Sequence, residues 1–257
     1  MPDAGRLAAR VAVVSGGSRG IGAAVVRALA REGASVVISD VLEAEGSALA
    51  AELGPAVRFA RLDVRSDENW AQVVADAERR FGPLSILVTC AGVMVVAPVE
   101  QATVEQFQRA YEVNVLGSLH LTKALLPRLI ASGDGTIVLL TSTAGFITYE
   151  GGAGYAAAKH AQHAMAATLR LELCGQPVRV IEIAPGMVRT DEFAVNRFRG
   201  DAGQAAAVYR GVREPLTAED IADAIAWTVT RPAHVNVDLM VLRPRAQAAQ
   251  HKVYREP

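Results

Sequence analysis

The sequence predicts a single α/β domain built on a doubly wound, parallel sheet of about seven strands. Short apolar, β-branched runs alternate with Ala-rich helical patterns along nearly the whole chain, which is typical of β-α-β units with right-handed crossovers. Several runs are apolar without alternation, as expected for strands covered by helices on both faces. The 257 residues are 51% hydrophobic and 21% charged, which is enough for a sizeable core. We find no repeat or linker, so residues 1–257 are expected to form one domain.

Each predicted strand is a short run rich in Val, Ile and Leu. In chain order the runs are 11–15, 35–40, 57–64, 84–89, 136–142, 178–186 and 237–242. A helix is expected after the first run, because Ile21, Val25 and Leu29 share one helical face. Further helices are expected around Trp70–Ala77, over 103–130 and over 153–174.

Charge and cysteine usage limit the classes of partner and compartment. The net charge is −1 and the sequence pI is about 6.5, which favours neither nucleic acid nor a membrane surface as partner. The N-terminus lacks the apolar stretch of a secretory signal, and Cys90 and Cys174 indicate no disulfide framework. We therefore expect a soluble, cytoplasmic protein. The basic stretch at 243–257 is expected to be a solvated tail.

A glycine cluster, SGGSRGIG at 15–22, joins the first predicted strand to the first helix. Gly16, Gly20 and Gly22 permit a tight turn and let backbone N–H groups approach a pyrophosphate at the positive end of the helix. The spacing differs from G-x-G-x-x-G, but the first βα turn is where such a fold binds dinucleotides. The loop therefore predicts a phosphate site.

Asp40 ends the second predicted strand, 18 residues after Gly22. A carboxylate there can accept hydrogen bonds from both ribose hydroxyls of an adenosine and would repel a 2′-phosphate, which favours NAD over NADP. Arg19 argues the other way, because a guanidinium in the glycine loop could pair with a 2′-phosphate. An ordinary surface-turn aspartate is the alternative. We predict NAD, with NADP left open.

Tyr155 and Lys159 are spaced i, i+4 on one face of a predicted helix, and Ser142 ends the fifth predicted strand. Hydride transfer to a carbonyl needs a proton donor, and a phenol with a pKa of about 10 is a weak one at neutral pH. An ammonium about 4 Å away contributes up to about 4 kcal/mol at an effective dielectric near 20. That could lower the phenol pKa by up to about three units.

These motifs jointly resemble the short-chain dehydrogenase/reductase family over essentially the whole chain. SGGSRGIG is similar to the family's TGxxxGxG loop, with Ser15 for threonine, and TCAG at 89–92 stands where NNAG is usual. Asn114, Ser142, Tyr155 and Lys159 match the family's catalytic tetrad. The resemblance implies an NAD(P)-binding Rossmann domain and a homo-oligomer, a tetramer or dimer. The segment 187–215 is expected to form a substrate lid.

The resemblance also implies a role for each tetrad residue. Tyr155 is the acid or base, Lys159 lowers its pKa and binds the nicotinamide ribose, Ser142 polarises the substrate oxygen, and Asn114 holds a relay water. With Asn114, Tyr155 and Lys159, the residues implied at the cofactor are Gly16, Ser18, Arg19, Gly20, Ile21, Gly22, Asp40, Asp63, Val64, Ala91, Gly92, Pro185, Gly186, Val188 and Thr190. The residues expected at the substrate are Met94, Ser142, Tyr149 and Phe193.

Other polar residues are given simpler interpretations. His160 and His163 are expected at a helix–helix interface or a solvated face, with no metal site, and Cys90 is expected to be inert. Arg189 and Arg197 would meet a substrate carboxylate only if the substrate is a hydroxy acid.

The expected activity is reversible oxidation of a secondary alcohol to a ketone with NAD. The stretches RFRGD, LTAEDIADAI and RPAHVNVDLMVLRP resemble the family branch that contains 3-hydroxy acid and serine dehydrogenases. The glycine loop is equally similar to that of hydroxysteroid and general alcohol dehydrogenases. The alternatives are therefore an NADP-dependent carbonyl reductase of a biosynthetic pathway and a 3-hydroxy acid dehydrogenase. A more distant one is a nucleotide-sensing protein without catalysis.

Overall fold

The computed structural model describes residues 5–66, 70–94, 96–190 and 201–256. Its centre is a sheet in which all neighbouring strands pair in parallel, in the order β3-β2-β1-β4-β5-β6-β7. The strands are β1 (Val11–Ser15), β2 (Ser35–Asp40), β3 (Val57–Arg61), β4 (Leu84–Thr89), β5 (Gly135–Leu140), β6 (Val178–Pro185) and β7 (Leu239–Leu242).

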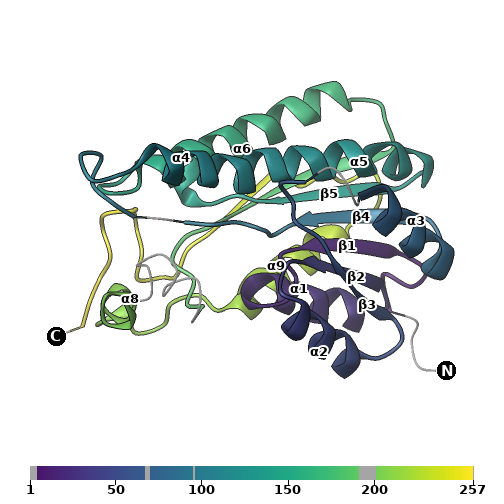
Figure 1. Cartoon of the computed structure of the whole chain (residues 1–257), viewed down its shortest axis with the longest axis horizontal. Helices are drawn as coiled ribbons and strands as arrows, with labels where there is room; N and C mark the ends of the chain where they lie inside the picture. The colour runs from purple at the N-terminus through teal and green to yellow at the C-terminus, as the bar shows by residue number, and fades with distance from the viewer. Residues whose placement is uncertain (1–4, 67–69, 95, 191–200, 257) are drawn as a thin grey trace.

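Helices cover both faces of this sheet, as Figure 1 shows. On one face lie α1 (Gly20–Arg31), α2 (Glu43–Leu53) and α9 (Ala218–Val229). On the other lie α3 (Trp70–Phe81), α4 (Val104–Tyr111), α5 (Gly117–Ala131) and α6 (Ala153–Glu172). The helix α8 (Ala202–Tyr209) lies away from the sheet, near the C-terminus. None of the helices in the described part of the chain is long and apolar enough to span a membrane.

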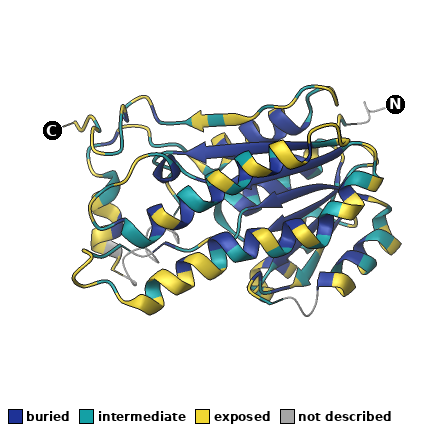
Figure 2. Cartoon of the chain, turned by 90° about the horizontal axis from the view of Figure 1, so that it is seen from above, coloured by how far each residue is buried: buried dark blue, intermediate teal, exposed yellow. Residues whose placement is uncertain are grey.

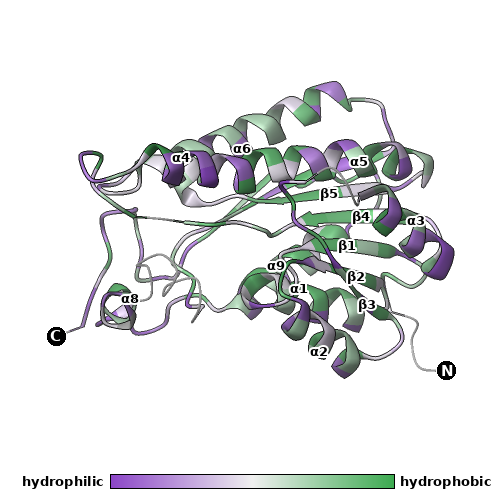
Figure 3. Cartoon of the chain, in the orientation of Figure 1, coloured by the Kyte–Doolittle hydropathy of each residue, from purple (hydrophilic) through white to green (hydrophobic). Residues whose placement is uncertain are grey.

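The central strands β1, β2, β4, β5 and β6 are buried on both faces, which explains their uninterrupted apolar character, whereas the edge strands β3 and β7 are partly exposed (Figure 2). In β1, Ala12 and Val14 pack against α1 and α9, while Val11 and Val13 pack on the opposite face. Full burial of one aliphatic side chain contributes about 1.5–3 kcal/mol. Figure 3 shows the same apolar character along the strands. The predicted doubly wound sheet of seven strands is confirmed.

Several predicted elements differ in extent from the structure. The runs 136–142, 178–186 and 237–242 form strands over Gly135–Leu140, Val178–Pro185 and Leu239–Leu242. The run 57–64 ends as a strand at Arg61, because its partner Asp40 is the last residue of β2. The helix expected over 103–130 is divided by a π-helical turn, Glu112–Leu116, between α4 and α5. A short 3₁₀ turn, Thr143–Gly145, follows β5. π-helical turns are common at functional sites, and this one contains Asn114.

The strand order places one crevice at the carboxyl edge of the sheet. β1 pairs with β2 on one side and with β4 on the other, so the chain winds in opposite directions from β1 and from β4. The loops that follow these two strands therefore diverge, and open α/β sheets bind ligands where they do so. Polar residues that follow β1, β4, β5 and β6 meet at this edge.

Candidate active site

The glycine loop between β1 and α1 has the shape that a pyrophosphate requires. Gly16 and Gly20 have φ values of +64° and +55°, a region that favours glycine. A Cβ on Gly22 would lie 2.0 Å from the carbonyl oxygen of Gly16. α1 begins with no side-chain cap from Arg19 and no acidic residue in its first turn, so its first N–H groups can bind an anion. The loop fits the phosphates of a dinucleotide.

Asp40 lies beside this loop and is held by three backbone N–H groups. One carboxylate oxygen accepts from Ser18 N at 3.1 Å, and the other accepts from Val41 N at 2.7 Å and Leu42 N at 3.2 Å. The Ser18 hydroxyl donates to the Leu42 carbonyl at 3.2 Å. The end of β2 is thus fixed to the glycine loop, with a carboxylate between them.

Two other residues expected at the cofactor, Ala91 and Thr190, lie beside the glycine loop. A Cβ on Gly16 would meet the Ala91 backbone at 2.7 Å, and one on Gly20 would lie 3.8 Å from the Thr190 methyl group. Asp63 forms a 2.6 Å ion pair with Arg65, whose hydrogen bonds lower the pKa of that carboxyl. The structure therefore brings together segments that are distant in the sequence, after β1, β4 and β6.

Tyr155 and Lys159 lie on the first turns of α6 and are almost completely buried, with 8% and 5% of their surface exposed. The Lys159 Nζ atom is 5.6 Å from the centroid of the Tyr155 ring and donates a hydrogen bond to the Leu140 carbonyl at 2.9 Å. Burial lowers the pKa of the Lys159 ammonium to about 8, against the opposing effects of Cys90 and Glu182. A cation is thus held beside the phenol ring.

Ser142 begins the 3₁₀ turn after β5. Its hydroxyl accepts from Ala144 N at 3.1 Å and lies 3.4 Å from the Pro185 carbonyl, to which it donates. Asn114 is fully buried, and its side-chain amide accepts from Val93 N at 2.8 Å and donates to Val93 O at 2.9 Å. Asn114 therefore fixes the backbone of Val93 in the segment that follows β4. Its predicted role of holding a relay water is separate from these two hydrogen bonds.

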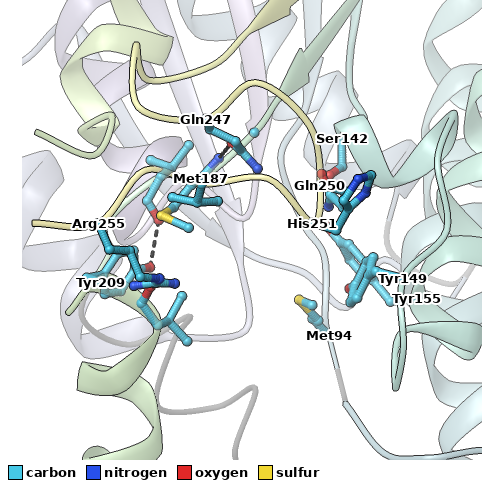
Figure 4. Close-up of a pocket in the computed structure, with 14 residues that line it drawn as sticks. Met94, Ser142, Tyr149, Tyr155, Met187, Tyr209, Gln247, Gln250, His251 and Arg255 are labelled. Atoms are coloured by element: carbon cyan, nitrogen blue, oxygen red, sulfur yellow. Dashed lines mark hydrogen bonds between the residues drawn. The ribbon is translucent and has the colours of Figure 1, made fainter. Parts of the chain in front are cut away.

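A cavity of about 370 Å³ opens beside Ser142 and Tyr155 (Figure 4). Met94 and Tyr149, both expected at the substrate, line it together with Gly186. Tyr149 also packs with Tyr155 in a small apolar cluster, and a Cβ on Gly152 would clash with its ring. The cavity contains the atoms that a reacting alcohol would need to reach.

Residues 243–256, which we term the C-terminal strap, form a wall of this cavity. Gln247, Gln250, His251, Val253 and Arg255 line it. In Figure 4, Gln250 and His251 lie near Ser142, whereas Arg255 lies on the opposite side beside Tyr209.

Contacts to the body of the domain hold the strap in place. The Gln247 side chain accepts from Met187 N at 2.8 Å, and the Gln250 side chain accepts from the Thr143 hydroxyl at 2.9 Å. Glu256 N donates to the carbonyl of Gly211 at 2.7 Å. The charged side chains Arg245, Lys252 and Arg255 are exposed, as expected of a tail, but the segment is held against the domain, which was not expected. The basic and amide side chains at 243–257 are the feature of the sequence that could have indicated a binding role for this segment. The sequence alone did not show that the segment packs against the cavity.

The proposed lid is described only in part. Phe193 and Arg197 fall in 191–200, outside the described residues. Arg189 stacks over the Tyr209 ring at 5.3 Å, and the Tyr209 hydroxyl donates to the Val188 carbonyl at 2.8 Å. Residues 188 and 216 form a parallel bridge. Arg189 is not among the residues that line the cavity, while Met187, Val188 and Tyr209 are.

The histidines after Tyr155 have different environments. His160 Nδ1 lies 2.8 Å from the Ala156 carbonyl, within α6. His163 is partly exposed and also contacts the Glu182 carboxylate of β6, a contact with the sheet that the sequence did not predict. Within the described ranges, no three potential ligands gather as a metal site. Burial raises the pKa of the Cys90 thiol to about 12, which makes it a poor nucleophile at neutral pH.

Comparisons with known proteins extend over nearly the whole chain. The profile of the family described as short chain dehydrogenase matches residues 10–198. An uncharacterized oxidoreductase of Mycobacterium tuberculosis is 47% identical over 248 residues, which are 96% of each chain. The NADP-dependent 3-hydroxy acid dehydrogenase YdfG of Escherichia coli is 33% identical over 93% of this chain and 96% of its own.

A solved structure, the closed form of serine dehydrogenase complexed with NADP⁺, superposes with a TM-score of 0.90 at 32% identity. It covers 96% of this chain and 100% of the solved one. The similarity therefore includes the C-terminal half, which forms much of the cavity wall.

Proposed function

The chain belongs to the short-chain dehydrogenase family, oxidoreductases that act on CH–OH donors, and we propose that it interconverts a secondary alcohol and a ketone with Tyr155 as acid and base. The observation that carries this proposal is that Ser142 and Tyr155 line one cavity while the Lys159 ammonium lies beside the Tyr155 ring. A bound nicotinamide dinucleotide would accept or supply the hydride.

Residues of this chain can carry out the proton transfer that accompanies hydride transfer. During oxidation the Tyr155 phenolate removes the proton from the substrate hydroxyl, and during reduction the phenol returns it to the nascent alkoxide. The Lys159 ammonium stabilises the phenolate, and its hydrogen bond to Leu140 fixes its position. The Ser142 hydroxyl can donate to the substrate oxygen as negative charge develops there. The low exposure of Tyr155 and Lys159 strengthens these interactions by excluding water.

For the cofactor, we propose the dinucleotide without a 2′-phosphate, NAD. The Asp40 carboxylate at the end of β2 supports this choice, because a phosphate placed there would meet a like charge. Arg19 and the NADP named for YdfG and for serine dehydrogenase support the alternative. The ratio of kcat/KM with the two cofactors decides between them.

For the substrate, a 3-hydroxy acid is the class that the cavity favours. Arg255 and His251 line the cavity opposite and beside Ser142, and both can pair with a carboxylate. The Arg255 guanidinium donates to the carbonyls of Arg210 and Val208, which are neutral groups, so its charge stays available. A neutral sterol or simple alcohol would gain no ionic contact from this cation.

A substrate panel tests the proposal. The purified protein is assayed with NAD and NADP against 3-hydroxy acids, their methyl esters, sterols and simple secondary alcohols. We expect oxidation of the acids and a much lower kcat/KM for the esters. Arg255→Gln should raise KM for the acids alone, whereas Arg31→Gln, at an exposed arginine of α1 outside the cavity, should not. Equal rates for acid and ester would exclude the hydroxy acid while leaving the oxidoreductase in place.

We also propose a homo-oligomer of two or four copies. Leu239 and Val241 are exposed on β7, the strand at the edge of the sheet. Val104, Phe107 and Tyr111 are exposed along α4. Exposed apolar side chains on an edge strand and on one helix support pairing with a second copy. Light scattering at two protein concentrations measures the mass, and a monomer at both would exclude the oligomer.

A further inference from the structure

Glu182 is a fully buried carboxylate in β6 that the proposed mechanism does not use. Two residues earlier on the same strand, Val180 packs in the apolar cluster beneath α5 and α6. A carboxylate in such a place is costly unless it is paired and hydrogen-bonded, and apolar replacements of buried ions are often neutral or stabilising. The position therefore suggests a function other than packing.

Its carboxylate has polar contacts with two other elements. The Thr141 hydroxyl donates to one oxygen at 2.8 Å, and His163 Nδ1 of α6 lies 3.1 Å and 2.9 Å from the two oxygens. Arg170, two turns further along α6, has its guanidinium 4.0 Å away. The ring of Phe146 stacks edge-on against His163 with centroids 4.4 Å apart. Glu182 thus joins the end of β5 to α6.

Both contacts are adjacent to the catalytic residues. Thr141 directly precedes Ser142, and His163 lies one helical turn after Lys159 on the same face of α6. The Lys159 ammonium itself is bound to the carbonyl of Leu140, which precedes Thr141. The Glu182 carboxylate therefore contacts the residue before Ser142 and a residue one helical turn after Lys159.

We propose that Glu182 is a positioning residue for the active site, which clamps the Ser142 end of β5 to α6 and supplies the counter-charge of the Lys159 ammonium. This inference rests on the proposed function in one respect only, that Lys159 acts as an ammonium.

The charges around Lys159 support this assignment. Burial lowers the pKa of Lys159 to about 8, and Cys90 and Glu182 are the two groups that oppose it. Because the Cys90 thiol has a pKa of about 12, it is neutral when Lys159 titrates. Glu182 is then the acting anion. Without it, burial would drive the Lys159 pKa still lower, and less ammonium would remain to stabilise the Tyr155 phenolate.

The groups that face Glu182 set how much of its charge reaches Lys159. From α6 they are His163 and Arg170, and the Arg170 guanidinium also donates to the Asp238 carbonyl beside β7. The Asp238 carboxylate is held by Asn236. A neutral His163 that donates to Glu182 leaves the negative charge in place, whereas an imidazolium would cancel it. The His163 side chain is 35% exposed, so solvent protons can reach it.

The titration of Lys159 can be followed directly, because the chain contains three lysines, Lys123, Lys159 and Lys252. With ¹³C at the lysine ε-carbon, three NMR signals are expected, and the two exposed lysines serve as references within the same sample. Lys159→Met assigns the buried signal. Glu182→Gln, which keeps the shape and an acceptor for Thr141, should lower the Lys159 pKa by on the order of one unit. Glu182→Asp, which keeps the charge, should change it less.

An unchanged Lys159 titration in folded Glu182→Gln would overturn the proposal. If that variant does not fold, the partly exposed His163 provides a second route. His163→Arg places a permanent cation against Glu182 and should lower the Lys159 pKa, while His163→Gln should not. His160→Arg is the matched control, because it adds a cation to the same helix away from Glu182. Equal shifts in His163→Arg and His160→Arg would also overturn the proposal.

The NMR titration needs no turnover. The role of Glu182 can therefore be tested even if the protein oxidises none of the panel alcohols. In an active enzyme, the alkaline limb of kcat/KM should move to lower pH in Glu182→Gln, together with the NMR titration. A loss of stability alone would not move that limb.

Discussion

The Lys159 ammonium lies 5.6 Å from the centre of the Tyr155 ring, one helical turn away on α6. This distance follows from the i, i+4 spacing, but the direction of the ammonium is set by the Leu140 carbonyl at the end of β5. The catalytic pair is therefore defined by a helix and by the edge of the sheet together.

The first prediction concerns the Tyr155 hydroxyl. Tyr155→Phe keeps the ring and its packing but removes the proton donor, so kcat should fall by roughly 10²- to 10⁴-fold or below detection. Cofactor affinity, measured by fluorescence titration, should stay near the wild-type value. Substantial residual turnover in this variant would refute the assigned role.

The second prediction concerns pH. Lys159 is charged below its pKa of about 8 and loses its charge above it. Alcohol oxidation needs both the ammonium and the phenolate, so kcat/KM should decline as pH rises through about 8. Cys90→Ser should leave this limb in place, because the thiol is protonated over the whole range. A limb that disappears in Cys90→Ser would assign it to the thiol instead.

The third prediction concerns cofactor choice. Asp40→Asn keeps an acceptor for the N–H groups of Val41 and Leu42 but removes the negative charge. We expect kcat/KM with NADP to rise relative to that with NAD by at least about tenfold, which corresponds to about 1.4 kcal/mol. Steady-state kinetics with both cofactors measures the ratio. An unchanged ratio would mean that Asp40 does not contact this part of the cofactor.

The fourth prediction concerns the C-terminal strap. Gln247 is 7% exposed and accepts the hydrogen bond of Met187 N. Gln247→Ala leaves that N–H group without its partner and should destabilise the fold by about 1–3 kcal/mol and raise the substrate KM. Gln247→Glu retains an acceptor and should lose less. Urea unfolding and substrate titration measure the two effects, and identical values for wild type and Gln247→Ala would contradict the strap's role.

The fifth prediction separates the two cysteines. Cys174 is exposed, whereas the raised pKa of Cys90 leaves almost no thiolate at neutral pH. Iodoacetamide at pH 7.5 should therefore label Cys174 quickly and Cys90 only on unfolding. Mass spectrometry of the labelled peptides gives the order of reaction, and rapid labelling of Cys90 would show that its thiol is ionised in the folded chain.

Most of the sheet could be predicted because its signal is local. β1, β2 and β4 begin and end at the predicted residues, since each is an unbroken apolar run limited by turn residues. The π-helical turn around Asn114 could not be predicted. Its residues have ordinary helical character, and its shape depends on the hydrogen bonds from Asn114 to Val93, a residue in a different segment.

The sequence by itself determined the doubly wound sheet, the glycine loop and the Tyr155–Lys159 pair, because these depend on periodicity and spacing within short segments. Only the tertiary structure decided which residues form the far wall of the cavity. The strap that carries Gln247 and Arg255 reaches the site through contacts with Met187 and with the carbonyls near α8. It also decided that Glu182 and His163 meet beneath the catalytic lysine, since the pairing of β5 with β6 and the packing of α6 on the sheet are long-range contacts that no local pattern encodes.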